Sequence, residues 1–431
     1  MRKIEEYYVA IWCLFMPVTS FLLIPAIQGT IIPYMMGFGS IVFVLTKITS
    51  GRFSPEIVGY FKSFILVGVL WSALLVGSQL ADMINPPNDV LSMFTISTKS
   101  RLLMRASLFT QSIYLLACVM IALYFRYFMP EKWMKYVYLG GWFFALYGLY
   151  DWAFYLVFKT SGDFIANRTF MGGDHPGSWA QGISLGPLQL IRLKSCLGEP
   201  SFVAAVVIPY LLMAIDGRKR VLTALLFIAA VLTTSTTVYL GMLVTFVIQI
   251  ILSNRSRGPG LVVLAIFGLA LVALKLLYPD FFDSIFGQKF SGDNDSGNGR
   301  MKNIEEYLHL YSQFNILNWI FGVGFGYLYF TLGWALTANT GLLGVGSFLY
   351  TMLKPAFLLP REPGYEWLKI SMFSIVIVMI LSVSELFIPT TWMFIGLAHR
   401  SLSMYRAQRP GPTGRPHAEP VRARQLEPLV S

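Results

Sequence analysis

Long apolar stretches separated by polar turns recur along almost the whole chain. About twelve can be counted in the sequence, near residues 7–27, 31–47, 57–79, 107–127, 136–157, 200–215, 221–234, 237–253, 260–278, 338–359, 369–385 and 388–404. A helix of ~20 apolar residues crosses a bilayer. The stretches are continuously apolar, whereas the strands of a membrane β-barrel alternate. The pattern therefore predicts an all-α polytopic integral membrane protein with about twelve transmembrane helices.

The polar connections alternate between short basic turns and longer segments. The basic turns carry Arg2/Lys3, Lys47/Arg52, Arg126/Lys132/Lys135, Arg218/Lys219/Arg220, Arg255/Arg257, Arg361 and Arg400/Arg406. The positive-inside rule places these turns and both termini in the cytoplasm. The long loops 80–106, 158–199 and 279–337 then face outward. We expect residues 1–406 to form one transmembrane domain, and the Pro- and Arg-rich residues 407–431 to form a disordered cytoplasmic tail.

Composition fits this class and narrows the possible partners. The chain is 55% hydrophobic and 13% charged, whereas a soluble domain carries about 25% charged residues. The formal net charge of +11 would suggest nucleic acid for a soluble protein. Here the positive-inside rule explains it, so the expected partners are membrane lipids and no nucleic acid. Neither a metal site nor a nucleotide motif is expected, so any chemistry lies outside and uses a substrate that arrives already activated.

Positive side chains on the outer side are the unexpected feature. Arg101 and Arg105 lie four residues apart at the start of the fourth stretch, where they are expected to share a helix face. Arg192 and Lys194 precede the sixth stretch, and Arg300 lies in the large loop. Each alone fits a side chain that reaches lipid headgroups. Three clusters on one face favour an anion site, and the planar fork of arginine suits phosphate or pyrophosphate.

Two carboxylates accompany these cations. Glu199, in "CLGEPSF", precedes a proline at the mouth of a predicted span. It can cap the following helix or act as a base whose pKa is raised near the membrane surface. Asp151 lies within an apolar stretch, so it either pairs with a buried cation or has a functional role.

The polar stretch 291–326 contains a predicted helix and a glycine-rich end. After Arg300, apolar Ile304, Leu308 and Tyr311 are expected on one helix side, as in a helix that lies in the interface plane. The stretch ends in "GVGFG", residues 322–326, which also fits an ordinary tight turn.

Several short motifs, taken in order, carry a family likeness. They are "GEPSF" (198–202), "LTTSTTVYLG" (232–241), "GNGR" (297–300), "NWIFGVGFG" (318–326) and "NTGLLGVG" (339–346). Together they resemble bacterial O-antigen polymerases of the Wzy type and, more distantly, O-antigen ligases. The likeness covers about residues 191–346, and the first half is similar mainly in its pattern of spans.

The resemblance implies an architecture of the GT-C type and an active site on the periplasmic face of the bacterial inner membrane. Such enzymes polymerise undecaprenyl-pyrophosphate-linked repeat units into O-antigen, capsule or exopolysaccharide, with no cofactor or metal. It also implies a chain-length regulator and a flippase of the same pathway as partners. Arg300 corresponds by position to the family's loop arginine that engages the donor pyrophosphate.

Two departures separate the chain from the ligases. The ligases have an arginine after the serine of the "T-x-S" turn, where this sequence has Thr236 after Ser235, and a histidine that is absent here between His309 and Gly341. The alternatives are a ligase that transfers glycan to lipid A core and a transporter or flippase for a lipid-linked saccharide. The expected catalytic residues are Glu199 and Arg300. The expected substrate-binding residues are Arg101, Arg105, Arg192, Lys194, Asp151 and Tyr239.

Overall fold

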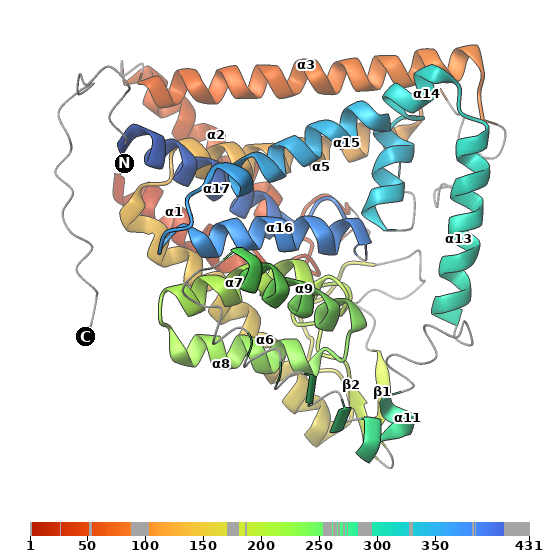
Figure 1. Ribbon diagram of the computed structural model, residues 1–431. Helices are drawn as coiled ribbons and strands as arrows, with labels where there is room; N and C mark the ends of the chain where they lie inside the picture. The colour runs from red at the N-terminus through yellow and green to blue at the C-terminus, as the bar shows by residue number, and fades with distance from the viewer. Residues whose placement is uncertain are drawn as a thin grey trace.

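The computed structural model describes most of the chain, and nearly all of what it describes is helical (Figure 1). The described residues are 2–25, 27–50, 54–87, 103–169, 181–185, 188–252, 295–326, 331–381, 383 and 385–408, together with short pieces between 261 and 282. The predicted tail 407–431 lies outside them, apart from the last turn of α17, which ends at Gln408.

The helices of the first half are α1 (Arg2–Phe15), α2 (Ile32–Thr49), α3 (Pro55–Ile84), α5 (Ala106–Tyr127), η1 (Glu131–Tyr136), α6 (Val137–Phe158), α7 (Val203–Asp216), α8 (Arg220–Leu232) and α9 (Thr236–Leu252). Those that follow are α11 (Pro279–Phe282), α13 (Asp295–Ser312), α14 (Ile316–Phe321), α15 (Leu332–Leu358), α16 (Glu366–Leu381) and α17 (Pro389–Gln408). An antiparallel hairpin of β1 (Gly182–Leu185) and β2 (Leu188–Ile191) precedes α7.

The described helices identify a membrane protein. Four of them, α2, α3, α5 and α15, are long and apolar enough to cross a bilayer. Three shorter apolar helices, α7, α8 and α9, accompany them. The all-α membrane class is therefore confirmed, whereas the full number of about twelve spans stays a prediction. Every predicted span except 260–278, which lies mostly outside the described residues, coincides with a helix over at least part of its length.

The first predicted span, 7–27, is wrong in its extent. Helix α1 ends at Phe15, where Pro17 removes a backbone donor and opposes a further helical turn. The chain then runs as turns and extended backbone to α2, and its amides bond to distant segments. The Thr19 amide, for example, donates to the Cys196 carbonyl at 3.0 Å. A helix of 14 residues is only about 21 Å long.

The helices pack side by side and place the basic turns that the structure describes at one end, which we call the basic end (Figure 1). There Lys47, in the last turn of α2, pairs with Glu5 of α1 at 2.7 Å. Tyr136 beside α6 donates to Glu6 of α1 at 2.8 Å. The grouping agrees with the alternation of loops in the sequence, while the compartment that each end faces stays a prediction.

The opposite end, which we call the polar end, collects segments 16–31, 159–169 and 192–202 and the α8–α9 and α16–α17 turns. Helix α13 lies across this end, roughly perpendicular to the long helices (Figure 1). Its buried face carries Tyr307 and Leu310, whereas Leu308 is 54% exposed. The predicted helix is confirmed, and the expected placement of Ile304, Leu308 and Tyr311 in the membrane interface stays a prediction.

Candidate functional site

The segment 192–199 crosses the polar end between β2 and α7, and backbone bonds hold it on two sides. The Leu193 amide donates to the Leu232 carbonyl at the end of α8, at 3.0 Å. The Cys196 carbonyl accepts the amide of Thr19 from the segment that follows α1. Because both neighbours are distant in sequence, the segment has a fixed path over the ends of α8 and α1.

Arg192 lies between this segment and the α8–α9 turn. Its Nε donates to the Thr233 carbonyl at 3.2 Å, and its Nη1 donates to Gln181 Oε1 at 2.5 Å. Burial lowers the pKa of Arg192, and the nearby charges of Tyr239 and Glu199 oppose this effect. The structure therefore brings three of the predicted site residues together: Arg192, Glu199 and Tyr239. The Tyr239 hydroxyl donates to the Val231 carbonyl at 2.7 Å.

Glu199 is half-buried in the turn that precedes α7. Helix α7 begins at Val203, its N-cap is Phe202, and no side chain caps it. The expected capping role of Glu199 is therefore wrong, because the helix starts later than Pro200 suggests. Burial raises the pKa of Glu199, the Ser201 hydroxyl bond at 3.1 Å and the positive charge of Arg192 oppose this, and the charge of Glu385 adds to it.

Two charged residues at this place escaped the sequence analysis. Glu385, in the α16–α17 turn, interacts electrostatically with Glu199 and also with Tyr34 and Tyr114. Arg168 interacts with the same two tyrosines. Both residues lie in loops that were predicted to face outward, so a list of all charged residues in those loops would have included them. Only the three-dimensional structure places Glu385 near Glu199, and Arg168 near the same tyrosines as Glu385.

Arg168 belongs to the loop that follows α6. Its Nε donates to Gln28 Oε1 and its Nη1 donates to the Thr19 carbonyl, both at 3.2 Å. The same loop bonds to segment 16–31 through its backbone, because the Arg168 amide donates to the Ser20 carbonyl at 3.0 Å. Arg168 is thus held on segment 16–31, whereas Arg192 lies near Glu199.

Lys194 and Asp151 lie in a separate, buried network. Lys194 is 1% exposed and pairs with Asp163 at 2.5 Å. Asp151 accepts the Gly162 amide at 2.8 Å and lies near Lys194. Of the two roles expected for Asp151, this geometry favours the partner of a buried cation. The burial of Lys194 and its pair with Asp163 favour a structural role, and its expected substrate contact stays a prediction.

Arg105 also has structural partners. It is 4% exposed, and its guanidinium donates to the Val323 carbonyl at 2.9 Å and to the Gly324 carbonyl. It precedes α5 in extended conformation, and Met104 before it has a φ of 52°. The expected face shared with Arg101 is therefore wrong for Arg105. Arg101 lies outside the described residues.

The "GVGFG" and "NTGLLG" motifs meet at the same joint. The Val323 amide donates to the Ala338 carbonyl at 2.8 Å, and the Gly326 amide donates to Asn339 Oδ1 at 2.7 Å. Gly341 interrupts α15 with φ 60° and ψ −170°, a region of backbone space used almost only by glycine. The glycines thus allow the backbones of α14 and α15 to approach closely, and they hold the two helices together.

Arg300 belongs to α13, whose first residue is Asp295. The helix therefore begins before Arg300 and includes the "GNGR" stretch. The side chain of Arg300 lies outside the described part of the structure, so its expected contact with pyrophosphate stays a prediction.

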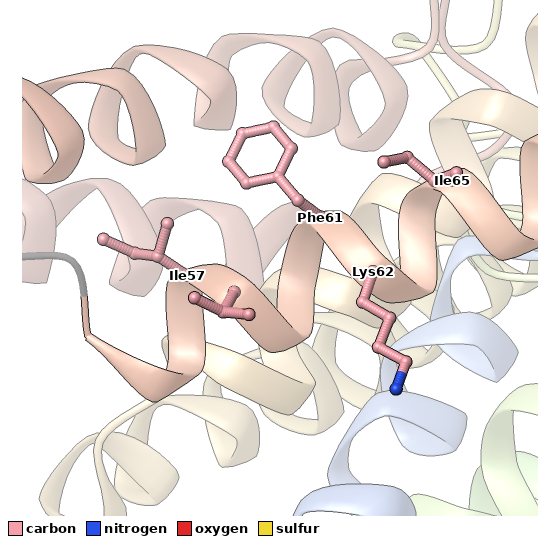
Figure 2. A pocket seen from close by; sticks show the side chains of 5 residues that line it. Ile57, Phe61, Lys62 and Ile65 are labelled. Carbon is pink, nitrogen blue, oxygen red and sulfur yellow. The ribbon is translucent and has the colours of Figure 1, made fainter.

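An open groove lies elsewhere, on the first half of α3, and is lined by Ile57, Val58, Phe61, Lys62 and Ile65 (Figure 2). Phe61 and Ile65 point to one side of the helix and Lys62 to the other. The groove is near the basic end, whereas Arg192 and Glu199 lie at the polar end. It therefore takes no part in the candidate site.

The described residues contain no group of three or more His, Cys, Asp or Glu side chains placed to hold a metal ion. No protein-family model matches the chain. No curated protein matches it either. The residues of the structure therefore define the candidate site. They are Glu199 and Arg192, with Tyr239 and Glu385 near them, and Arg168 beside the tyrosines that Glu385 also faces.

Proposed function

We propose that the protein is a membrane glycosyltransferase that polymerises undecaprenyl-pyrophosphate-linked repeat units at the periplasmic face of a bacterial inner membrane. The observation that carries the proposal is that Glu199 lies near Arg192 and Glu385 at the polar end, where Arg168 interacts with the same two tyrosines as Glu385. A half-buried carboxylate near a guanidinium group suits a reaction in which a hydroxyl loses a proton and a pyrophosphate leaves. The sequence motifs around these residues support the same chemistry.

In the proposed reaction, a sugar hydroxyl of one repeat unit attacks the anomeric carbon of the lipid-linked donor. The new carbon–oxygen bond forms as the bond to the pyrophosphate breaks, and the lipid pyrophosphate leaves with that electron pair. Glu199 accepts the hydroxyl proton. Its raised pKa suits this role, since a base works best when its pKa lies near the working pH.

The arginines would act on the leaving group. Charge develops on the pyrophosphate oxygens in the transition state, and fixed cations that face it lower the barrier. Arg192 is held by Thr233 and Gln181, so its guanidinium needs little reorganisation. Arg300 on α13 remains the proposed partner of the pyrophosphate that the family resemblance implies.

The test is polymerisation in vitro by the full-length protein in lipid nanodiscs, supplied with a synthetic undecaprenyl-pyrophosphate repeat unit. The products are separated by length on a gel. Glu199→Gln should reduce the rate by ~10²–10⁴-fold, the usual loss when a general base is removed. Arg192→Gln should also reduce it. Lys132→Gln, which changes an exposed cation of η1, is the matched control and should retain the wild-type rate.

Wild-type activity in Glu199→Gln would contradict the assignment of the base. Transfer of a single glycan to lipid A core, without growth of the lipid-linked chain, would instead identify a ligase. The length of the glycan and the lipid that carries it therefore distinguish a polymerase from a ligase.

A transporter is the second candidate, and a different observation favours it. Transporters bind substrates where a membrane helix is interrupted, and α15 is interrupted at Gly341, which lies against Ile320 of α14. Helix α14 in turn contacts the buried Asp82 through Asn318 at 3.2 Å. Movement of a fluorescent lipid-linked saccharide across a liposome membrane, without lengthening of the glycan, would support this candidate. Chain growth without net movement would exclude it.

A further inference from the structure

Helix α3 packs on its neighbours with one face and exposes the other along its whole length. On the packed face, Gly59 and Ser63 lie against Tyr127 of α5, and the hydroxyls of Ser63 and Tyr127 are 2.7 Å apart. On the other face, Val58 is 57% exposed and Ile65 is 61% exposed. The same face continues through exposed Leu66, Val69, Val76, Leu80 and Met83. Because α3 is long and apolar enough to span a bilayer, lipid is the environment that this face fits.

The groove shown in Figure 2 lies on the first half of this exposed face and contains one charged side chain. Its volume is about 460 Å³, and Lys62 is the one charged residue among the five that line it. Lys62 lies about 100° around the helix from Phe61, and Val58 and Ile65 lie between them. Among the described residues, Lys62 has no ion pair and no hydrogen bond. The groove therefore joins an apolar strip to a cation that no described carboxylate neutralises.

The other charges near this groove leave its surroundings positive. Glu56 is six positions before Lys62, which places it about 120° away around the helix. The guanidinium of Arg126 lies over the Tyr127 ring, 4.8 Å from its centroid, and Tyr127 contacts Ser63, the residue that follows Lys62. An anion in the groove would thus meet Lys62 directly and a second cation near it.

The length of α3 places Lys62 at the level of the lipid headgroups. The helix has 30 residues and is therefore about 45 Å long, whereas the hydrocarbon core of a bilayer is ~30 Å thick. Its last residues, Met83 and Ile84, are apolar and exposed. About twenty residues counted back from Ile84 fill the core, so Lys62 lies about 5 Å beyond it. A lysine at this depth places its ammonium among the headgroups while its stem stays on apolar surface.

We propose that Lys62 and the groove on α3 bind an anionic phospholipid of the bilayer leaflet at the basic end. The negatively charged headgroup lies against the Lys62 ammonium. The first part of an acyl chain lies over Val58 and Ile65, beside the Phe61 ring. A zwitterionic phospholipid fits the same apolar strip but brings a positive group close to the lysine, so charge selects the class of lipid. The groove and Glu199 lie at opposite ends of the helices, so this inference does not rest on the proposed function.

The test is native mass spectrometry of the full-length protein in detergent, with dioleoylphosphatidylglycerol or dioleoylphosphatidylcholine added. The wild type should bind the anionic lipid more tightly than the zwitterionic lipid. Lys62→Gln should weaken the binding of phosphatidylglycerol about fivefold, the effect of one lysine near an anionic membrane surface, and leave that of phosphatidylcholine unchanged. Lys132→Gln changes an exposed cation of η1, outside the groove, and is the matched control. It should keep the preference of the wild type.

Three results of this measurement would overturn the proposal. Equal affinity of the wild type for both lipids would show that the apolar face is only coated by lipid in general. An equal loss in Lys132→Gln would show an effect of net charge. A dimer of the protein that disappears in Phe61→Ala would show that a second copy of the chain occupies the groove.

A photoreactive lipid then locates the bound molecule. Phosphatidylglycerol with a diazirine near the start of one acyl chain is added to the protein and irradiated, and mass spectrometry identifies the modified peptides. Modification should concentrate at residues 57–65 and should decrease in Phe61→Ala, which removes one side of the groove. Val69→Ala, at an exposed position further along the same face, leaves the lining residues intact and should not change it. If modification avoided residues 57–65, the lipid would bind elsewhere and the assignment of the groove would be wrong.

Discussion

Lys194 and Asp163 form a buried ion pair in which Nζ and Oδ2 are 2.5 Å apart and each side chain is 2% exposed. Asp163 also accepts the Tyr147 hydroxyl at 2.7 Å and the Ala166 amide at 3.2 Å. The pair therefore ties the loop that carries Arg168 to the segment that carries Arg192 and Glu199. The relative position of these two loops thus depends on a buried ion pair.

Lys194→Met should destabilise the protein strongly, because it leaves the Asp163 charge buried without its partner. Breaking a buried pair in this way costs about 3–5 kcal/mol. The thermal midpoint in detergent, followed by fluorescence, measures the loss. Adding Asp163→Asn should recover part of it, because a neutral amide replaces the stranded charge. Lys62→Met, at an exposed cation, should stay within ~0.5 kcal/mol of wild type, and an equal loss there would contradict the explanation.

Gly341→Ala and Gly322→Ala should both destabilise the contact between α14 and α15. A Cβ at Gly341 would lie 2.4 Å from the Ile320 carbonyl, and one at Gly322 would lie 2.4 Å from the Asn339 carbonyl carbon. The backbone conformation alone costs about 1–3 kcal/mol for other residues. Gly346→Ala is the control on the same helix, since a Cβ there meets nothing within 4 Å. Comparable thermal midpoints for Gly341→Ala and Gly346→Ala would refute this account.

The helices could be predicted from the sequence because their signal is local. An apolar run of sufficient length has few alternatives in a membrane, so α2, α3 and α5 lie where the pattern placed them. The predicted extent of the first span was wrong because its apolar residues continue beyond Pro17, into a segment that hydrogen-bonds to distant loops. Hydrophobicity alone does not distinguish a buried extended segment from a helix.

The candidate site was only partly predictable, because charge partners depend on tertiary contacts. Arg192 and Glu199 are seven positions apart and were predicted together. Lys194, which lies between them, points into a different network with Asp163. Glu385 belongs to a turn almost two hundred positions further along the chain. No local pattern could link it to Glu199.

The stability of Glu199→Gln relative to wild type should depend on pH. Burial raises the pKa of Glu199 in the folded protein above its ordinary value of 4.5. Between that value and the folded pKa, the folded state binds more protons than the unfolded state, so wild-type stability falls as pH rises. The glutamine does not titrate. The thermal midpoint of Glu199→Gln minus that of wild type should therefore increase from pH 4.5 upward and then level off. A decrease of this difference would show that folding lowers the pKa of Glu199.

Arg300→Ala should shorten or abolish the polymer without changing the thermal midpoint, because the proposed partner of Arg300 is a donor pyrophosphate and not another part of the protein. In the part of α13 whose side chains the structure describes, Tyr307 and Leu310 are buried. Arg300→Lys should restore only part of the activity, since a point charge replaces a planar fork that donates two parallel hydrogen bonds. Arg361→Ala, at an exposed cation of the basic end, is the control. If Arg300→Ala made polymer of wild-type length at equal protein level, the assignment of Arg300 to the site would be contradicted. A lowered thermal midpoint would instead indicate a structural role in α13.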